Sequence, residues 1–126
     1  MNFTENELQV MQILWNAKTD LSRKDIIEQS PNRTWKDNSI HVLLNSLMKK
    51  GAVKVVGMQP AGKVYARTFA ADISQEEYLS AQMTVSPPKG KDAFVGLFAA
   101  LVDQADLSDD TLDELQKILD ERKKKP

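Results

Sequence analysis

Apolar residues in the first half of the chain recur with a helical period in three segments. The first begins at Thr4 and the second at Ser22, and each start is followed three residues later by a carboxylate, which is the capping-box arrangement. The third segment, residues 36–50, repeats apolar residues at the i, i+3, i+4, i+7 spacing of a buried stripe and stops at Gly51, which is placed as a left-handed C-cap. The pattern therefore predicts three helices.

The pattern changes from helix to hairpin directly after the third segment. Residues 52–56 read as a strand, residues 57–63 contain two glycines and a proline, and residues 64–69 alternate as a second strand. Three helices followed by a hairpin predict a winged helix-turn-helix domain over residues 1–70, with the third helix as recognition helix and the hairpin as wing. The predicted fold class is mainly α with this small β-hairpin.

Residues 71–126 carry further helical stripes of apolar residues. Pro87 and Pro88 are expected to interrupt the helical pattern. The stripes are too few to enclose a core, so we expect them to close against a symmetry mate, which makes residues 71–126 a helical homodimerisation domain. The alternative is that they pack back on the winged helix of the same chain. The residues predicted to form the dimer contact are Tyr78, Phe94, Leu97, Phe98, Leu101, Val102, Leu112, Leu115, Ile118 and Leu119.

Charge divides the chain into two unlike halves. Residues 1–70 hold seven Lys and three Arg against three Asp and three Glu, a net charge of +4, and residues 71–126 have a net charge of −5. A basic first half suits a phosphate surface, whereas an acidic second half would be repelled from one. The alternative is that both charges are ordinary solvated surface.

Several kinds of site are excluded by composition. The chain has no cysteine and a single histidine, so we expect no disulfide, no thiolate or histidine metal site and no cysteine nucleophile. It has no phosphate-cradling glycine loop and no catalytic constellation, so neither a cofactor nor an enzymatic activity is expected. With no apolar run of membrane-spanning length and no signal-peptide pattern at the start, we expect a cytoplasmic protein without membrane insertion.

The outward face of the third helix is polar and mostly uncharged, which suits contact with base edges. Flanking cations in the first half suit contact with phosphates. Asp37 is unfavourable near phosphate, so we expect it to be structural; Asn38 could instead serve at the helix start, and His41 could be an ordinary surface histidine. The residues predicted to contact DNA are Arg33, Lys36, Asn38, Ser39, His41, Val42, Asn45, Ser46, Lys49, Lys50, Lys63 and Arg67.

Four short motifs occur in one order along nearly the whole chain. They are ELQVMQILW at residues 7–15; Thr34, Trp35, Ser39, Ile40, Leu43, Leu47, Lys50 and Gly51; Gly62, Lys63 and Tyr65; and Asp106, Leu107, Ser108, Leu112, Glu114 and Leu115. In this order they resemble the penicillinase repressor family of winged-helix transcriptional repressors, of the BlaI, MecI and CopY type.

The resemblance implies a homodimeric repressor on a palindromic operator in double-stranded DNA, with one recognition helix per half-site. In antibiotic-responsive members a membrane sensor-protease pathway triggers cleavage within the C-terminal helices, and Ala100 and Leu101 occupy the position of the family's Asn-Phe cleavage bond. Asn38 and Ser46 stand where family members often carry Lys and Arg, and the copper-sensing cysteine tail is missing. The alternative function is a winged-helix protein–protein interaction module without sequence-specific DNA binding.

Overall fold

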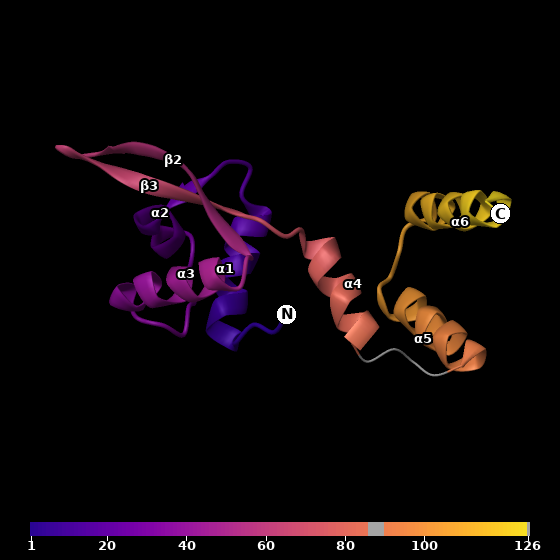
Figure 1. Cartoon of the computed structure of the whole chain (residues 1–126). Coiled ribbons are helices and arrows are strands. Elements are labelled where there is room, and N and C mark those ends of the chain that lie inside the picture. The colour runs from indigo at the N-terminus through magenta and orange to yellow at the C-terminus, as the bar shows by residue number, and fades with distance from the viewer. Residues whose placement is uncertain (86–89, 126) are drawn as a thin grey trace. The chain divides into compact units, whose positions relative to one another are not determined.

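All three predicted helices of the first half are present in the computed structural model, which describes residues 1–85 and 90–125 (Figure 1). They are α1 (Glu5–Asn16), α2 (Arg23–Glu28) and α3 (Ile40–Lys49), and a short 3-10 turn, η1 (Asp37–Ser39), leads into α3. Both predicted capping boxes are formed, with Thr4 heading α1 and Ser22 heading α2. Gly51 has the predicted left-handed conformation, with φ of +78°.

The sheet has three antiparallel strands in the order β1-β3-β2. They are β1 (Leu21–Ser22), β2 (Val53–Ala61) and β3 (Val64–Ala71). Both hairpin strands are longer than predicted: the segment around Pro60 continues β2 after an irregularity between Val55 and Gly57. Pro60 is tolerated because β2 is an edge strand, where a missing N–H costs no ladder bond. The strand β1 is too short to leave a periodic signal in the sequence.

The core lies among the three helices and the base of the sheet. Met11 on α1, Ile26 on α2, Leu44 and Leu47 on α3 and Phe69 on β3 are fully buried. The remaining buried apolar residues are Val10, Leu14, Leu21, Trp35, Ile40, Ala52 and Val53. The prediction of a mainly helical winged-helix fold with a small antiparallel sheet is therefore confirmed.

The chain divides into two compact units, Met1–Val85 and Ser86–Pro126. The first unit extends past the domain boundary predicted at residue 70, because it includes α4 (Gln75–Val85). The Tyr78 ring on α4 stacks on Phe3, with ring centroids 4.8 Å apart, and lies 5.6 Å from the Trp15 ring. Trp15 Nε1 also donates to the Ile73 carbonyl at 2.8 Å. The prediction that Tyr78 contributes to the dimer contact is therefore corrected: its ring packs within its own chain.

The second unit contains α5 (Lys91–Gln104) and α6 (Asp109–Lys124). The predicted cap of α6 is present, with Ser108 Oγ accepting from the Thr111 backbone N–H at 3.2 Å. No residue of these two described helices is fully buried. The helix interruption predicted at Pro87 and Pro88 lies outside the described residues.

Candidate nucleic-acid interface

One face of α3 and its leading turn is exposed and polar. The exposed residues of this face are Asn38, His41, Val42, Asn45 and Lys49, and Val42 is 69% exposed. They recur at intervals of three and four residues, so they form one continuous row along the helix. The opposite face of α3 packs into the core. Ser39, which was also predicted to contact DNA, is half-buried.

This row offers short polar groups of the kind that read base edges. An Asn amide can donate and accept at one adenine edge, and an apolar side chain can contact a thymine methyl group. Lys49 is the single formal charge in the row. The chemistry of the row therefore favours discrimination between bases, and phosphate attraction must come mainly from its surroundings.

The wing supplies further cations next to this face. The hairpin turns at Gly62, whose φ is +67°, and β2 and β3 extend beyond α2 to this tip (Figure 1). Lys63 at the turn and Arg67 on β3 are exposed, as is Lys36 before α3. None of these three forms an ion pair with another described residue, so all three are free to meet phosphates.

Side chains from α2 contact both strands of the wing. Gln59 Nε2 on β2 donates to Asp25 Oδ2 at 3.0 Å. The pKa of Asp25 lies below its usual range because it accepts from the Ser22 backbone N–H and from Gln59. Arg23 lies over the Phe69 ring, and burial together with the nearby charge of Arg67 lowers its pKa.

Arg33, which was predicted to contact DNA, is bound by residues of its own chain. Its Nη1 donates to the carbonyls of Ser30 at 3.1 Å and Ile27 at 3.4 Å, and its Nη2 pairs with Asp37. Its guanidinium carbon lies 5.2 Å from the centre of the Trp35 ring. Both Nη atoms thus serve as a structural tie, which the prediction of a DNA contact did not foresee. Asp37 is structural, as predicted, through this pair.

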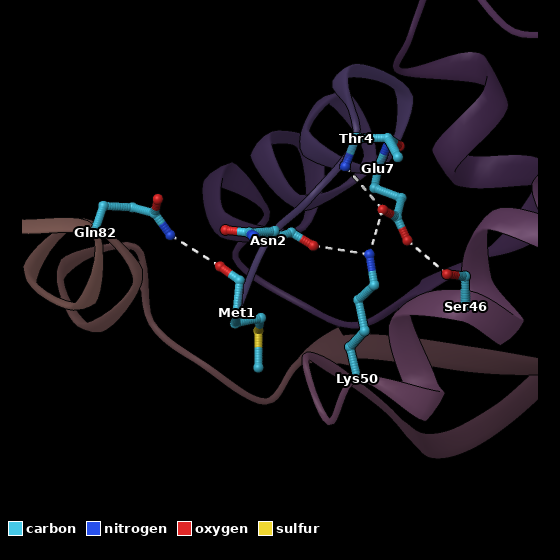
Figure 2. Close-up of polar contacts among 7 residues, drawn as sticks. All are labelled: Met1, Asn2, Thr4, Glu7, Ser46, Lys50 and Gln82. Carbon is cyan, nitrogen blue, oxygen red and sulfur yellow. Dashed lines mark hydrogen bonds and ion pairs between the residues drawn. The ribbon is translucent and has the colours of Figure 1, made fainter. Parts of the chain in front are cut away.

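Ser46 and Lys50 also face inward, toward α1 (Figure 2). Both approach the carboxylate of Glu7 to 2.6 Å, Ser46 Oγ at Oε2 and Lys50 Nζ at Oε1. Lys50 Nζ in addition donates to the Asn2 carbonyl at 2.8 Å. The prediction that these two side chains contact DNA did not foresee this binding to Glu7. The sequence placed Ser46 on the polar side of α3 and Lys50 at the end of the helix, but a buried carboxylate on α1 lies within reach of both.

Glu7 is 2% exposed and yet ionised. Burial by itself would raise its pKa, but hydrogen bonds from Lys50, Ser46 and the Thr4 backbone N–H outweigh burial and lower the pKa to about 2. Sequence reasoning assigned Glu7 only to the capping box with Thr4. Its Oε1 does accept from Thr4 N at 2.8 Å, and the same carboxylate holds the recognition helix.

Thr34, in the segment before α3, is also hydrogen-bonded to α1. Thr34 Oγ1 lies 2.6 Å from Asn6 Oδ1 and accepts from Gln9 Nε2 at 3.1 Å. The Thr34 backbone N–H donates to Gln9 Oε1 at 3.2 Å. Asn6 and Gln9 on α1 thus bind the segment before α3, and Glu7 binds the C-terminal end of α3. Their apolar neighbours dominated the helical pattern, which is why the sequence did not reveal them.

The described residues offer little for other chemistries. No three His, Cys, Asp or Glu side chains among them are grouped closely enough to hold a metal ion. No helix in the part of the chain that the structure describes is both long and apolar enough to cross a membrane.

The three-helix unit with its exposed polar α3 and basic wing defines a winged-helix DNA-binding protein. Residues 3–121 match the sequence model of the penicillinase repressor family. The chain belongs to this family of bacterial transcriptional repressors.

Individual relatives cover most of the chain. The methicillin resistance regulatory protein MecI of Mammaliicoccus sciuri is 27% identical over 116 residues, which span 92% of this chain and 91% of MecI. An uncharacterised 16.5 kDa protein from the ptsI 3′ region of Latilactobacillus sakei is 30% identical over 120 residues, spanning 92% and 77%. The solution structure of monomeric Bacillus licheniformis BlaI in complex with the blaP half-operator is 25% identical, with a TM-score of 0.45, and the match spans 62% of this chain and 89% of BlaI.

Proposed function

We propose that the protein is a homodimeric transcriptional repressor that places α3 of each subunit in the major groove of one half-site of a palindromic operator. The observation that carries this proposal is the exposed row of Asn38, His41, Val42 and Asn45 beside a basic wing. Membership in the penicillinase repressor family supports the same function. In this proposal the row reads bases, while Lys36, Lys49, Lys63 and Arg67 bind phosphates.

The second unit is proposed to join the subunits. On α5, Phe94, Phe98 and Leu101 are 56%, 40% and 55% exposed and lie on one side of the helix, and Ile118 on α6 is 61% exposed. Apolar side chains repeated in this way along a helix favour an isologous contact with a second copy. The other residues predicted for this contact are exposed Leu112 and Leu119 and half-buried Leu97, Val102 and Leu115.

We further propose that proteolysis within α5 releases the operator, through a membrane sensor-protease pathway of the kind that the family resemblance implies. Ala100 and Leu101 are exposed on α5, and Leu101 belongs to the proposed dimer contact. Cleavage there would divide the apolar stripe. Loss of the second subunit would then remove the gain in effective concentration that two linked half-sites provide.

Operator binding is tested with a duplex isolated from a random-sequence pool by repeated selection with the full-length protein. Fluorescence anisotropy should show binding on the order of 10³-fold tighter than to a scrambled duplex, with a steep decrease in affinity as salt rises. Asn45→Ala should weaken binding to the selected duplex by roughly 1–3 kcal/mol and leave binding to the scrambled duplex unchanged. No preference for the selected duplex would refute the proposal.

Dimerisation is tested with a charge placed on the apolar side of α5. Leu101→Asp should yield monomers in sedimentation velocity, because burying an unpaired carboxylate in the contact costs several kcal/mol. Ala100→Asp is the matched control, since it adds the same charge to the adjacent exposed position outside the stripe. A dimeric Leu101→Asp variant would show that α5 does not form the contact.

A protein-interaction module is the second candidate, because the row on α3 holds a single charge and its most exposed apolar residue is Val42. This function predicts weak and salt-insensitive binding to all duplexes. The same titration therefore separates the two candidates.

A further inference from the structure

The first four residues connect the recognition helix to α4 through a series of contacts (Figure 2). Lys50 Nζ, at the end of α3, donates to the Asn2 carbonyl and lies 5.9 Å from the centre of the Phe3 ring. The Phe3 ring in turn stacks on Tyr78 of α4. Gln82 Nε2, one turn further along α4, donates to the Met1 carbonyl at 2.9 Å. We call residues 1–4 the arm.

Glu7 lies at the centre of these contacts. Its carboxylate accepts from the arm at Thr4 N and from α3 at Ser46 Oγ and Lys50 Nζ. Each of the two α3 donors lies within 2.6 Å, which is the short range of charge-assisted hydrogen bonds. Because Glu7 is hydrogen-bonded to both α3 and the arm, a shift of either would leave a buried charge without partners. The carboxylate therefore fixes the position of α3 relative to the arm.

We propose that Glu7 and the arm position α3 for operator binding, so that Lys50 acts through Glu7 and not through a DNA phosphate. Ser46 and Lys50 are one turn apart at the C-terminal end of α3, and Asn45 and Lys49 of the exposed row each lie one residue step, about 100°, around the helix from them. A rotation of α3 about its axis would therefore move Asn38, His41 and Asn45 relative to the groove. This inference rests on the proposed operator function.

Adjacent lysines provide a matched test. Lys49 is exposed and forms no ion pair with a described residue, whereas Lys50 is paired with Glu7. In full-length protein, Lys49→Met should reduce the slope of log affinity against log salt by about 0.9 per subunit, the value of one lost phosphate contact. Lys50→Met should leave that slope unchanged and weaken binding at every salt concentration, on the order of tenfold.

Glu7→Gln gives opposite results under the two possible roles of Lys50. If Lys50 acts through Glu7, Glu7→Gln weakens binding about as much as Lys50→Met, and the double variant is no weaker than either single variant. If Lys50 binds phosphate, Glu7→Gln releases the lysine toward DNA, so binding strengthens or stays unchanged. That result, or a reduced salt slope in Lys50→Met, would overturn the proposal.

Binding is compared at a temperature at which far-ultraviolet circular dichroism shows each variant fully folded. Under this condition a contact that serves stability alone would leave affinity unchanged, and such a result in folded Lys50→Met would also overturn the proposal. Phe3→Ala provides a variant outside the ion pair: it removes the stack on Tyr78 and should weaken binding without a change in salt slope. If the wild-type protein shows no preference for the selected duplex, the proposed operator function is refuted. If the wild type binds and only the variant results differ from those expected, the positioning role alone is refuted.

Discussion

Ionisation of buried Glu7 makes a contribution to stability that can be isolated by pH. The folded protein holds the pKa of Glu7 at about 2, compared with 4.5 for the ordinary side chain. Because the pKa is lower in the folded state, the contribution is fully present above about pH 4.5 and is lost as the pH falls toward 2. Glu7→Gln keeps the shape of the side chain and removes the charge.

The size of the effect follows from the two pKa values. One pKa unit corresponds to about 1.4 kcal/mol, so ionised Glu7 contributes about 3 kcal/mol at neutral pH. The same linkage gives about 1.5 kcal/mol at pH 3, halfway through the transition. Glu7→Gln should therefore lower the free energy of unfolding by up to about 3 kcal/mol at pH 7 and by about half as much at pH 3.

Urea unfolding followed by tryptophan fluorescence measures this difference in the relevant part of the molecule, because Trp15 and Trp35 are the two tryptophans of the chain and both lie in the first unit. Glu5→Gln is the matched control: it removes an exposed carboxylate from the same first turn and should cost roughly 0.3–1 kcal/mol. The reasoning is refuted if Glu7→Gln destabilises the protein equally at pH 7 and pH 3.

Two further predictions concern local structure. Gly51→Ala should lower the free energy of unfolding by about 1–2 kcal/mol in the same urea assay, because φ is +78° and an added Cβ meets no atom within 4 Å, so that backbone strain alone acts. Gly96→Ala on α5, where an added Cβ is equally free, should instead stabilise its helix, and destabilisation there would contradict the argument. Tyr78→Ala should destabilise the first unit by roughly 1–3 kcal/mol, because the half-buried ring loses its aromatic contacts with Phe3 and Trp15, while sedimentation shows an unchanged oligomeric state. A monomeric but equally stable variant would restore Tyr78 to the dimer contact.

Local signals predicted the winged-helix unit well. The helices α1 and α2 each begin at a capping box, and Gly51 after α3 has a left-handed conformation, so these features depend on neighbours within a few residues. The strand β1 was missed because its two residues are defined by pairing with Thr68 and Phe69 far along the chain. The contact of α4 with the first unit through Tyr78 was not visible in the sequence for the same reason.

The candidate interface was predicted less completely than the fold. Helical periodicity separates buried from outward positions, and it placed Asn38, His41, Val42 and Asn45 correctly on the exposed side. Helical periodicity does not show which residues of other elements contact a polar side chain. Arg33 was therefore assigned to DNA although its guanidinium is bound to backbone carbonyls and to Asp37.

Lys49 and Lys50 show where this limit matters for function. The two lysines are identical in charge and adjacent in the chain, so composition and helix-end electrostatics treat them alike. One helical step of about 100° turns Lys49 toward solvent and Lys50 toward Glu7. The charged partner of Lys50 is the ionised, buried carboxylate of Glu7 on α1, and that carboxylate is recognisable in the sequence only as part of a cap. A count of basic residues on α3 therefore overestimates its phosphate contacts, and the salt dependence of binding should be shallower than that count implies.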